Sequence, residues 1–213
     1  MKQLTFYFDF ISPYAYLAFD KLPQVLQGLS FSVRYKPILF ASLLKAHGSL
    51  GPAEIPAKRD WTYRHVLWQG QAQGTPLALP AVHPFNPIEL LRLAVACQAQ
   101  GQPNRWVCER IFKHTWAEGG LPTDPQRLAA LKAELQPARE THDESVKAQL
   151  KAHSDEALAA GAFGVPTVAV DGKLFWGLDA LPMLRDYLDG GAWFQGPDWD
   201  AAPLVPVGIR RLG

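Results

Sequence analysis

The segment Phe6-Tyr-Phe-Asp-Phe-Ile-Ser12-Pro-Tyr-Ala-Tyr-Leu17 decides the fold, because it predicts a buried strand that turns directly into a helix. Residues 5–10 are aromatic and β-favouring, as expected of a buried strand. Ser12 is a good N-cap residue, and Pro13 suits the first helical turn. The Ser12 hydroxyl is therefore expected at the positive end of a helix, beside a sheet, where an anion can bind.

The residues after this corner predict a strand–helix–strand unit and then a block of helices. A helix over 13–27 joins strands expected at 3–10 and 31–35, so the two strands should be parallel. From residue 39 to about 149 the pattern is helical, with helices expected at 39–46, 56–73, 86–100 and 104–118. A further helix begins after Asp124, and two more follow, one ending near Lys151 and one capped by Ser154.

Strand patterns return only after Pro166. Residues 167–170 and 173–176 predict two strands joined by a hairpin turn at Asp171-Gly172, and a helix follows to about residue 188. The order of elements predicts an α/β fold with a large all-helical insertion. We expect the insertion at residues 41–150, and a discontinuous α/β domain made of residues 1–40 and 151–213.

Composition excludes several classes of function. The net charge is +1 without basic blocks, which argues against nucleic acid and against an anionic membrane surface. No stretch approaches the ~20 apolar residues of a membrane helix. Cys97 and Cys108 lie in separate predicted helices without metal-ligand spacing, and the six His do not cluster, so no metal is expected. Asp9 interrupts the first apolar run, so we expect no signal peptide and a cytoplasmic protein.

Five segments, spread in order along nearly the whole chain, carry a family pattern: Phe8-Asp-Phe-Ile-Ser-Pro-Tyr-Ala-Tyr-Leu17, Pro56-Ala-Lys58, His83-Pro-Phe-Asn-Pro87, Gly161-Ala-Phe-Gly-Val-Pro-Thr167 and Phe175-Trp-Gly-Leu-Asp179. Together they resemble one branch of the DsbA-like thioredoxin superfamily, which contains 2-hydroxychromene-2-carboxylate isomerases and kappa-class glutathione transferases. The segments at 35–40, 83–86 and 175–180 look more like the isomerases. The resemblance implies a thioredoxin-like fold split by the helical insertion.

In such proteins the reactive group stands at the start of the first helix, opposite a cis-proline. Ser12 and Pro166 match these two places, and without Cys at positions 12 and 15 disulfide exchange is excluded at this site. The resemblance implies glutathione as cofactor. Its thiolate would be stabilised by the helix start and the Ser12 hydroxyl, which lowers the thiol pKa and makes Ser12 the catalytic residue. An ordinary N-cap is the alternative role, and both can hold together.

The resemblance also implies residues that bind glutathione. A cis peptide between Val165 and Pro166 would present the Val165 backbone to the cysteinyl part; the alternative is a plain turn. Asp179, with Gly177 and Leu178 before it, would meet the γ-glutamyl ammonium; the alternative is an N-cap for the last helix.

Two further positions are implied less directly. Lys58 would contact the glutathione backbone or a carboxylate, unless it is simply a solvated helix lysine. Ser49 stands where the family often has Asn, and Leu178-Asp179-Ala180 stands where it often has Ser-Asp-Arg. These departures remove polar groups from the expected glutathione site, so a lower affinity or a different second substrate is expected.

An aromatic substrate would need an aromatic-lined pocket. Candidate residues for the second substrate are Tyr14, Asn86 and Trp116, with Trp61 and Trp176 as further walls and Arg64 and Arg92 as carboxylate partners. The alternatives are core packing for the aromatic residues, helix capping for Asn86 and surface ion pairs for the arginines.

Three functions are consistent with these residues. The first is a glutathione-dependent cis–trans isomerase of a small aromatic carboxylate, of the 2-hydroxychromene-2-carboxylate or benzylidenepyruvate type, in aromatic-compound catabolism. The second is a kappa-class-like transferase that conjugates glutathione to an electrophile. The third is a non-catalytic glutathione-binding protein. The family resemblance implies a homodimer.

Overall fold

The computed structural model describes residues 1–208 of the 213-residue chain, so the end of the predicted 151–213 segment, residues 209–213, lies outside the described residues. A four-stranded sheet has the order β2-β1-β3-β4. Its strands are β1 (Lys2–Phe8), β2 (Phe31–Pro37), β3 (Thr167–Val170) and β4 (Lys173–Trp176). β1 pairs parallel with β2 and antiparallel with β3, and β3 pairs antiparallel with β4. The predicted α/β thioredoxin-like fold is confirmed.

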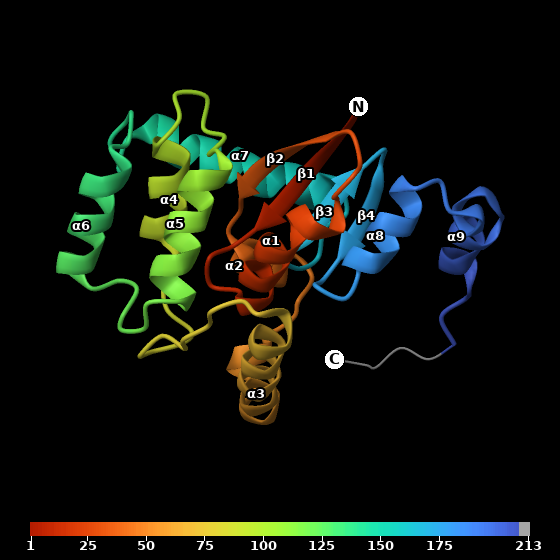
Figure 1. Ribbon diagram of the computed structural model, residues 1–213, viewed down its shortest axis with the longest axis horizontal. Coiled ribbons are helices and arrows are strands. Elements are labelled where there is room, and N and C mark those ends of the chain that lie inside the picture. The colour runs from red at the N-terminus through yellow and green to blue at the C-terminus, as the bar shows by residue number, and fades with distance from the viewer. Residues whose placement is uncertain (209–213) are drawn as a thin grey trace.

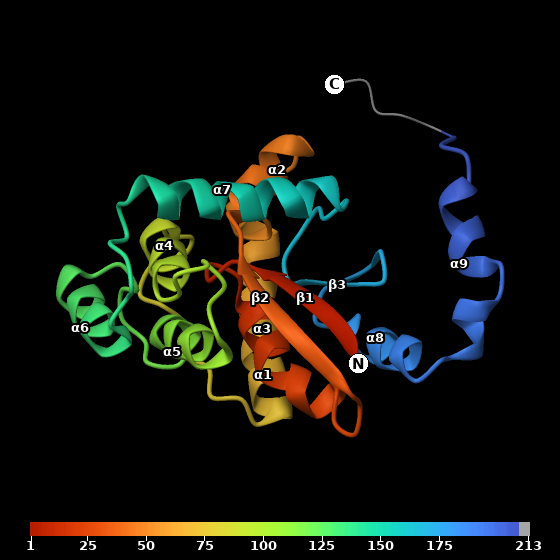
Figure 2. The ribbon, with the colours of Figure 1, turned by 90° about the horizontal axis from the view of Figure 1, so that it is seen from above.

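The helices lie around this sheet (Figure 1). They are α1 (Pro13–Val25), α2 (Phe40–Ala46), α3 (Pro56–Gln73), α4 (Ile88–Ala96), α5 (Arg105–Trp116), α6 (Pro125–Leu135), α7 (Glu144–Ala159), α8 (Leu181–Leu188) and α9 (Asp198–Ala201). Figure 2 shows α7 on one face of the sheet and α1 with α8 on the other. Helices α4, α5 and α6 stand together at one side, and α3 projects away from the sheet.

Strand β1 is buried on both faces, which explains its aromatic sequence. Leu4, Phe6 and Phe8 are fully buried in the larger core, and the Phe6 ring lies 6.4 Å from the ring of Phe19 on α1. Tyr7, on the opposite face, belongs to a second cluster with residues of α2 and α7. The first strand therefore anchors both layers of helices.

Helix α7 corrects one sequence prediction. Two helices were expected, with Ser154 as the cap of the second, but α7 runs without a break from Glu144 to Ala159. The Ser154 hydroxyl donates to the Leu150 carbonyl (3.1 Å) and accepts from the Leu39 N–H (3.0 Å). A serine whose hydroxyl finds the carbonyl four residues back does not interrupt a helix.

The start of α4 also differs from its prediction. The helix begins at Ile88 rather than after Asn86, and it ends at Ala96. The Asn86 side chain still accepts a hydrogen bond from the Ile88 N–H (3.1 Å). Glu89, in the first turn of this helix, contacts Arg92 (3.5 Å).

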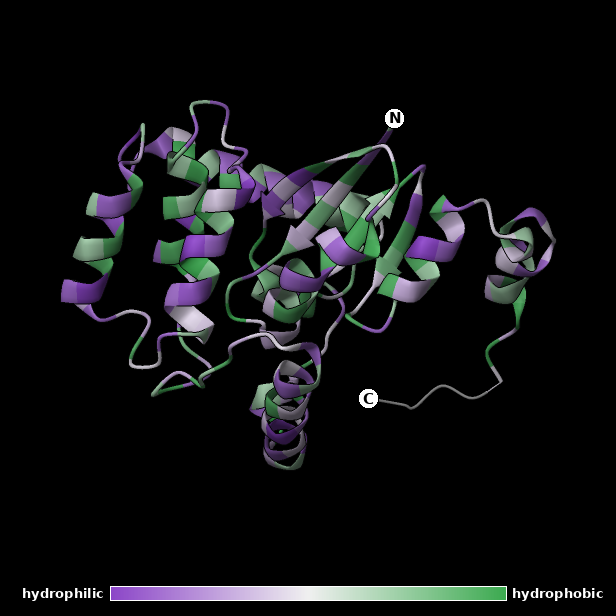
Figure 3. Ribbon diagram, viewed as in Figure 1, coloured by the Kyte–Doolittle hydropathy of each residue, from purple (hydrophilic) through white to green (hydrophobic). Residues whose placement is uncertain are grey.

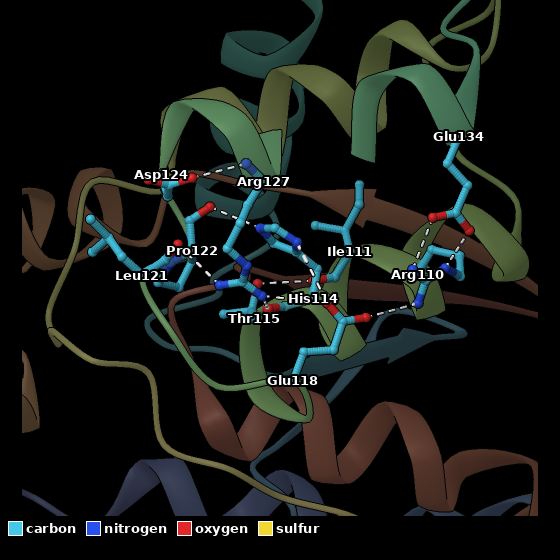
Figure 4. Close-up of polar contacts among 10 residues, drawn as sticks. All are labelled: Arg110, Ile111, His114, Thr115, Glu118, Leu121, Pro122, Asp124, Arg127 and Glu134. Carbon is cyan, nitrogen blue, oxygen red and sulfur yellow. Dashed lines mark hydrogen bonds and ion pairs between the residues drawn. The ribbon is translucent and has the colours of Figure 1, made fainter. Parts of the chain in front are cut away.

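A polar network joins α5 to α6 (Figure 4). Arg110 binds both carboxylate oxygens of Glu134, at 2.6 and 2.9 Å, and Arg127 donates to the backbone carbonyls of Leu121 and His114. Both arginines also contact Glu118 between them. Paired guanidinium–carboxylate contacts fix geometry, and this network holds the outer helix α6 in place.

One continuous hydrophobic core crosses the predicted domain boundaries. It runs from β1 through α1, α4 and α5 to Leu131 and Leu135 on α6. Figure 3 shows hydrophobic residues on the strands and along α4, and hydrophilic residues over much of α6 and α3. The division into 1–40 plus 151–213 and 41–150 stays a proposal, and its second boundary falls inside α7. Among residues 1–208, no helix is long and apolar enough to cross a membrane.

Candidate functional site

A cavity of about 1370 Å³ opens beside the corner between β1 and α1. Its walls come from this corner, α2, the 49–54 loop, α3, and the loops at 83–87, 163–166 and 177–182. Most predicted site residues reach it: Ser12, Tyr14, Ser49, Lys58, Val165, Pro166, Gly177, Leu178 and Asp179 line the cavity. Segments far apart in sequence are thus brought together around Ser12.

Ser12 is the N-cap of α1, as predicted. It is 8% exposed, has an extended backbone, and its Oγ accepts a hydrogen bond from the Ala15 N–H (3.2 Å). Pro13 has no N–H, and the Tyr14 N–H has no partner within residues 1–208. The helix start therefore offers a hydroxyl and an open N–H to a negatively charged atom in the cavity.

Asp9 holds this corner in place, a role that its interruption of the first apolar run does not predict. Its side chain is fully buried; one carboxyl oxygen accepts from the Ile11 N–H (3.1 Å) and the other from the Phe40 N–H (2.9 Å). Burial raises the pKa of Asp9 to about 7, although the two N–H donors act in the opposite direction. The sequence signal that could have identified Asp9 is a single carboxylate within a predicted aromatic strand.

The loop opposite Ser12 contains the predicted cis peptide between Val165 and Pro166. The Pro166 carbonyl accepts from the Gly177 N–H (2.9 Å), which connects this loop to the end of β4. The Val165 N–H and C=O have no hydrogen-bond partner in the described part of the chain. One unpaired donor and one unpaired acceptor are therefore available to an extended ligand, as at the open edge of a sheet.

A second cis peptide, between His83 and Pro84, was not predicted. His83 Nε2 lies 2.8 Å from the Ile11 carbonyl, and its Nδ1 lies 2.8 Å from the Tyr63 hydroxyl. Because a carbonyl only accepts, Nε2 carries a proton and donates to it. Burial lowers the pKa of His83, so the ring is neutral and Nδ1 accepts from Tyr63. His83 thus supports the residue next to Ser12.

Two charged side chains enter the cavity without partners among residues 1–208. Asp179 makes no hydrogen bond or ion pair, and α8 takes Ala180 as its N-cap residue, so the capping alternative for Asp179 is not observed. Lys58 is exposed on α3 and makes no ion pair. Gly177 has φ +97, and a Cβ there would lie 2.4 Å from an Asp179 carboxyl oxygen. The glycine keeps room for this carboxylate.

Residues 3–189 match the family model described as the DSBA-like thioredoxin domain. The chain belongs to the DSBA-like thioredoxin family. It is 32% identical over 190 residues to the 2-hydroxychromene-2-carboxylate isomerase of Pseudomonas putida, covering 85% of this chain and 92% of that protein. It is 27% identical over 214 residues to glutathione S-transferase kappa 1 of Rattus norvegicus, covering 92% and 94%. These similarities confirm the resemblance deduced from the motifs.

A solved structure of 2-hydroxychromene-2-carboxylate isomerase superposes with a TM-score of 0.74 at 25% identity, covering 92% of this chain and 98% of that one. The cytosolic disulfide reductase DsbM of Pseudomonas aeruginosa, solved with GSH, superposes with a TM-score of 0.56 at 18% identity, covering 91% of this chain and 97% of that one. The second likeness establishes the common DSBA-like fold alone.

Two predicted substrate residues do not reach the cavity of this DSBA-like chain. Trp116 is fully buried, and its indole N–H donates to the Phe10 carbonyl (2.8 Å). Asn86 is exposed outside the cavity wall. Arg92 pairs with Glu89, and Arg64 is exposed elsewhere on α3. Trp116 is therefore a core residue, and Asn86 accepts a hydrogen bond at the start of α4, as the alternative roles predicted. Long-range packing decides which aromatic residues remain accessible.

Other aromatic residues do line the cavity. Tyr14, Trp61 and Trp176 are at the wall, and the two tryptophans are 64% and 51% exposed. His65 also lines it, and its Nδ1 lies 2.8 Å from the Tyr14 hydroxyl. Helical periodicity in the sequence contains no signal for the contact between His65 and Tyr14, which are 51 residues apart.

Proposed function

We propose that this protein is a glutathione-dependent cis–trans isomerase of a small aromatic carboxylate, of the 2-hydroxychromene-2-carboxylate or benzylidenepyruvate type, in aromatic-compound catabolism. The observation that carries the proposal is that the Ser12 helix start and the unpaired Val165 backbone line one cavity. Relatives named 2-hydroxychromene-2-carboxylate isomerase, at about 30% identity over most of the chain, support the isomerase class.

The residues present fit glutathione. The unpaired Val165 N–H and C=O suit the cysteinyl backbone, because an extended peptide can pair there as at a sheet edge. Asp179 suits the γ-glutamyl ammonium, and Lys58 suits a carboxylate. Gly177, Leu178 and Ser49 complete the wall around these groups. Relatives named kappa-class glutathione transferases are consistent with this ligand.

The chain contributes an environment in which a thiolate is favoured. When bound, glutathione would supply a thiolate nucleophile for reversible addition to the conjugated carbon of the substrate. The Ser12 hydroxyl would donate to the sulfur, while its Oγ accepts from the Ala15 N–H. The helix dipole adds ~0.3–1 kcal/mol in favour of negative charge at this point. Both effects lower the thiol pKa.

The aromatic wall would select the second substrate. Trp61 and Trp176 offer exposed ring faces to a planar group. Homodimer formation stays a prediction from the family resemblance, and a cytoplasmic location stays a prediction from the sequence pattern.

The kappa-class alternative shares the glutathione site but consumes glutathione. The similarity to kappa-class transferases supports this alternative. The departures from the family pattern at Ser49 and Leu178 instead support the third function, a non-catalytic glutathione-binding protein. Product analysis separates the two: a free trans isomer with glutathione unchanged, or a thioether adduct. A non-catalytic glutathione-binding protein would give neither product.

The test follows the ultraviolet change of 2-hydroxychromene-2-carboxylate with and without glutathione. We expect glutathione-dependent conversion and a loss of about 10- to 100-fold in kcat for Ser12→Ala, since a hydrogen bond to a charged group is worth ~1.5–3 kcal/mol. Ser12→Thr keeps the hydroxyl and should retain activity.

Asn104→Ala is the matched control for lost capping, because Asn104 caps α5 outside the cavity by accepting from the Val107 N–H (2.9 Å). It should lose ~1 kcal/mol of stability, as Ser12→Ala does, with activity unchanged. If the wild-type protein shows no glutathione-dependent conversion, the proposed function is refuted.

A further inference from the structure

Tyr14 and His65 form a hydrogen-bonded pair in the same cavity as Ser12. The Tyr14 hydroxyl and His65 Nδ1 are 2.8 Å apart, and both side chains line the cavity. Tyr14 is the second residue of α1, two positions after Ser12, whereas His65 comes from α3. The pair therefore lies beside the place proposed for the thiolate, on the side of the aromatic wall.

The His65 ring is held between two tryptophans of its own helix. The Trp61 ring stacks on it at 5.9 Å and 9°, and the Trp68 ring at 6.1 Å and 16°. Gln69 lies 3.3 Å from His65 Nε2, so both ring nitrogens have polar neighbours. Stacking on both faces and contacts at both nitrogens restrict ring rotation. A restricted ring of this kind can hold the Tyr14 hydroxyl in one orientation.

The proposed isomerisation requires more than a thiolate when the substrate is the cyclic form. A 2-hydroxychromene-2-carboxylate is a cyclic hemiketal: the 2-hydroxyl and the ring oxygen are bonded to the same carbon. The ring must open before a double bond can rotate. Opening moves a proton from the 2-hydroxyl to the aryl oxygen, and neither Ser12 nor the glutathione contacts provide for that transfer.

We propose that Tyr14 is the proton-transfer residue for opening the hemiketal ring, with His65 as the residue that positions it. This inference rests on the proposed function. Tyr14 gives its hydroxyl proton to the aryl oxygen as the bond from that oxygen to C2 breaks, and the bond's electron pair stays on the aryl oxygen. The electron pair of the 2-hydroxyl O–H bond forms the C2 carbonyl, and the released proton returns to the Tyr14 oxygen.

No proton or electron is gained or lost in this step, and one hydroxyl can serve both oxygens because they share a carbon. With Nδ1 protonated, His65 donates to the Tyr14 oxygen and turns the hydroxyl proton toward the substrate. A tyrosine phenol has an ordinary pKa of about 10 and is protonated at neutral pH, and burial raises the pKa of Tyr14 further. The geometry and the protonation state therefore agree with a donor.

The experiment compares Tyr14→Phe with wild-type protein on two substrates in the presence of glutathione. One is unsubstituted 2-hydroxychromene-2-carboxylate; the other carries a nitro group para to the ring oxygen. We expect a loss of about 100-fold in kcat on the first, as for a removed general acid. The loss on the second should be less than about 10-fold, because a nitrophenolate leaves without needing a proton.

His65 is tested through rescue. His65→Ala should reduce kcat on the unsubstituted substrate by about 10-fold. His65→Asn should recover part of this loss, because an amide can occupy the position of Nδ1. Adding His65→Ala to Tyr14→Phe should cause little further loss, because both changes remove the same contact. Tyr187→Phe is the matched control: it deletes a tyrosine hydroxyl bonded to Asp171 (2.7 Å), outside the cavity.

Equal losses of Tyr14→Phe on both substrates, or full activity on both, would overturn the role of Tyr14. If Tyr14→Phe does not fold, the substituent dependence of His65→Ala and His65→Asn decides in the same way. Wild-type protein that shows no glutathione-dependent conversion would instead remove the proposed function itself, so the two failures are distinguishable.

Discussion

Replacing Asp9 by Asn should change how the stability of the protein depends on pH. Asp9 is fully buried, and burial raises its pKa to about 7 in the folded protein. An unfolded chain has an Asp pKa of ~3.9. Because the folded pKa is raised, the contribution of Asp9 to stability is fully present below the unfolded pKa and is lost as pH rises toward the folded pKa.

The magnitude follows from the difference between the two pKa values. One pKa unit corresponds to ~1.4 kcal/mol, so the full loss is about 4 kcal/mol, of which about 3 kcal/mol falls between about pH 5 and pH 8. The asparagine side chain of the variant would not titrate. Its amide would also leave the Ile11 or Phe40 N–H without an acceptor, at a cost of ~1–3 kcal/mol that does not vary with pH.

The assay is urea unfolding of the wild-type and Asp9→Asn proteins across this pH range. All other groups titrate in both proteins, so the difference between the two free energies of unfolding isolates Asp9. We expect the wild-type advantage to shrink by about 3 kcal/mol from about pH 5 to pH 8. A difference that stays constant within about 0.5 kcal/mol would show that the Asp9 carboxyl titrates normally and refute the reasoning.

Three further outcomes are expected. Phe112→Ala should cost ~3–5 kcal/mol in urea unfolding, because this fully buried ring contacts four aromatic neighbours; a loss below about 1 kcal/mol would contradict its central place. Lys58→Ala should weaken glutathione binding measured by calorimetry, and the loss of affinity should be smaller at high salt because salt screens an ionic contact. A loss of affinity that does not change with salt would argue against an ionic contact. Gly177→Ala and Gly172→Ala should each lose ~1–2 kcal/mol, since both have positive φ. Only Gly177→Ala, which crowds the Asp179 carboxylate, should also weaken glutathione binding. If the two variants bind glutathione with equal affinity, Asp179 does not bind the γ-glutamyl ammonium.

Local signals in the sequence were enough to predict the helices and strands around the corner between β1 and α1. Ser12 and Pro13 define a helix start through capping and a fixed φ, both properties of neighbouring residues. The helix between two apolar strands fixed the parallel pairing of β1 with β2. Capping likewise located α5 and α6, which begin after Asn104 and Asp124 as predicted. At Ser154 the same reasoning failed, because its hydroxyl donates to the Leu150 carbonyl inside α7 and also accepts from the Leu39 N–H.

Tertiary structure decided which side chains enter the cavity. By itself, the sequence determined the strand-to-helix corner, the parallel pair and the positions of Ser12, Pro166 and Asp179 relative to their elements. It did not determine that Trp116 is buried while Trp61 is exposed, or that Asp9 is enclosed. The pairing of Tyr14 with His65 likewise depends on how α3 packs against α1. Helical periodicity and capping depend on adjacent residues, whereas burial and side-chain contacts depend on segments that only folding brings together.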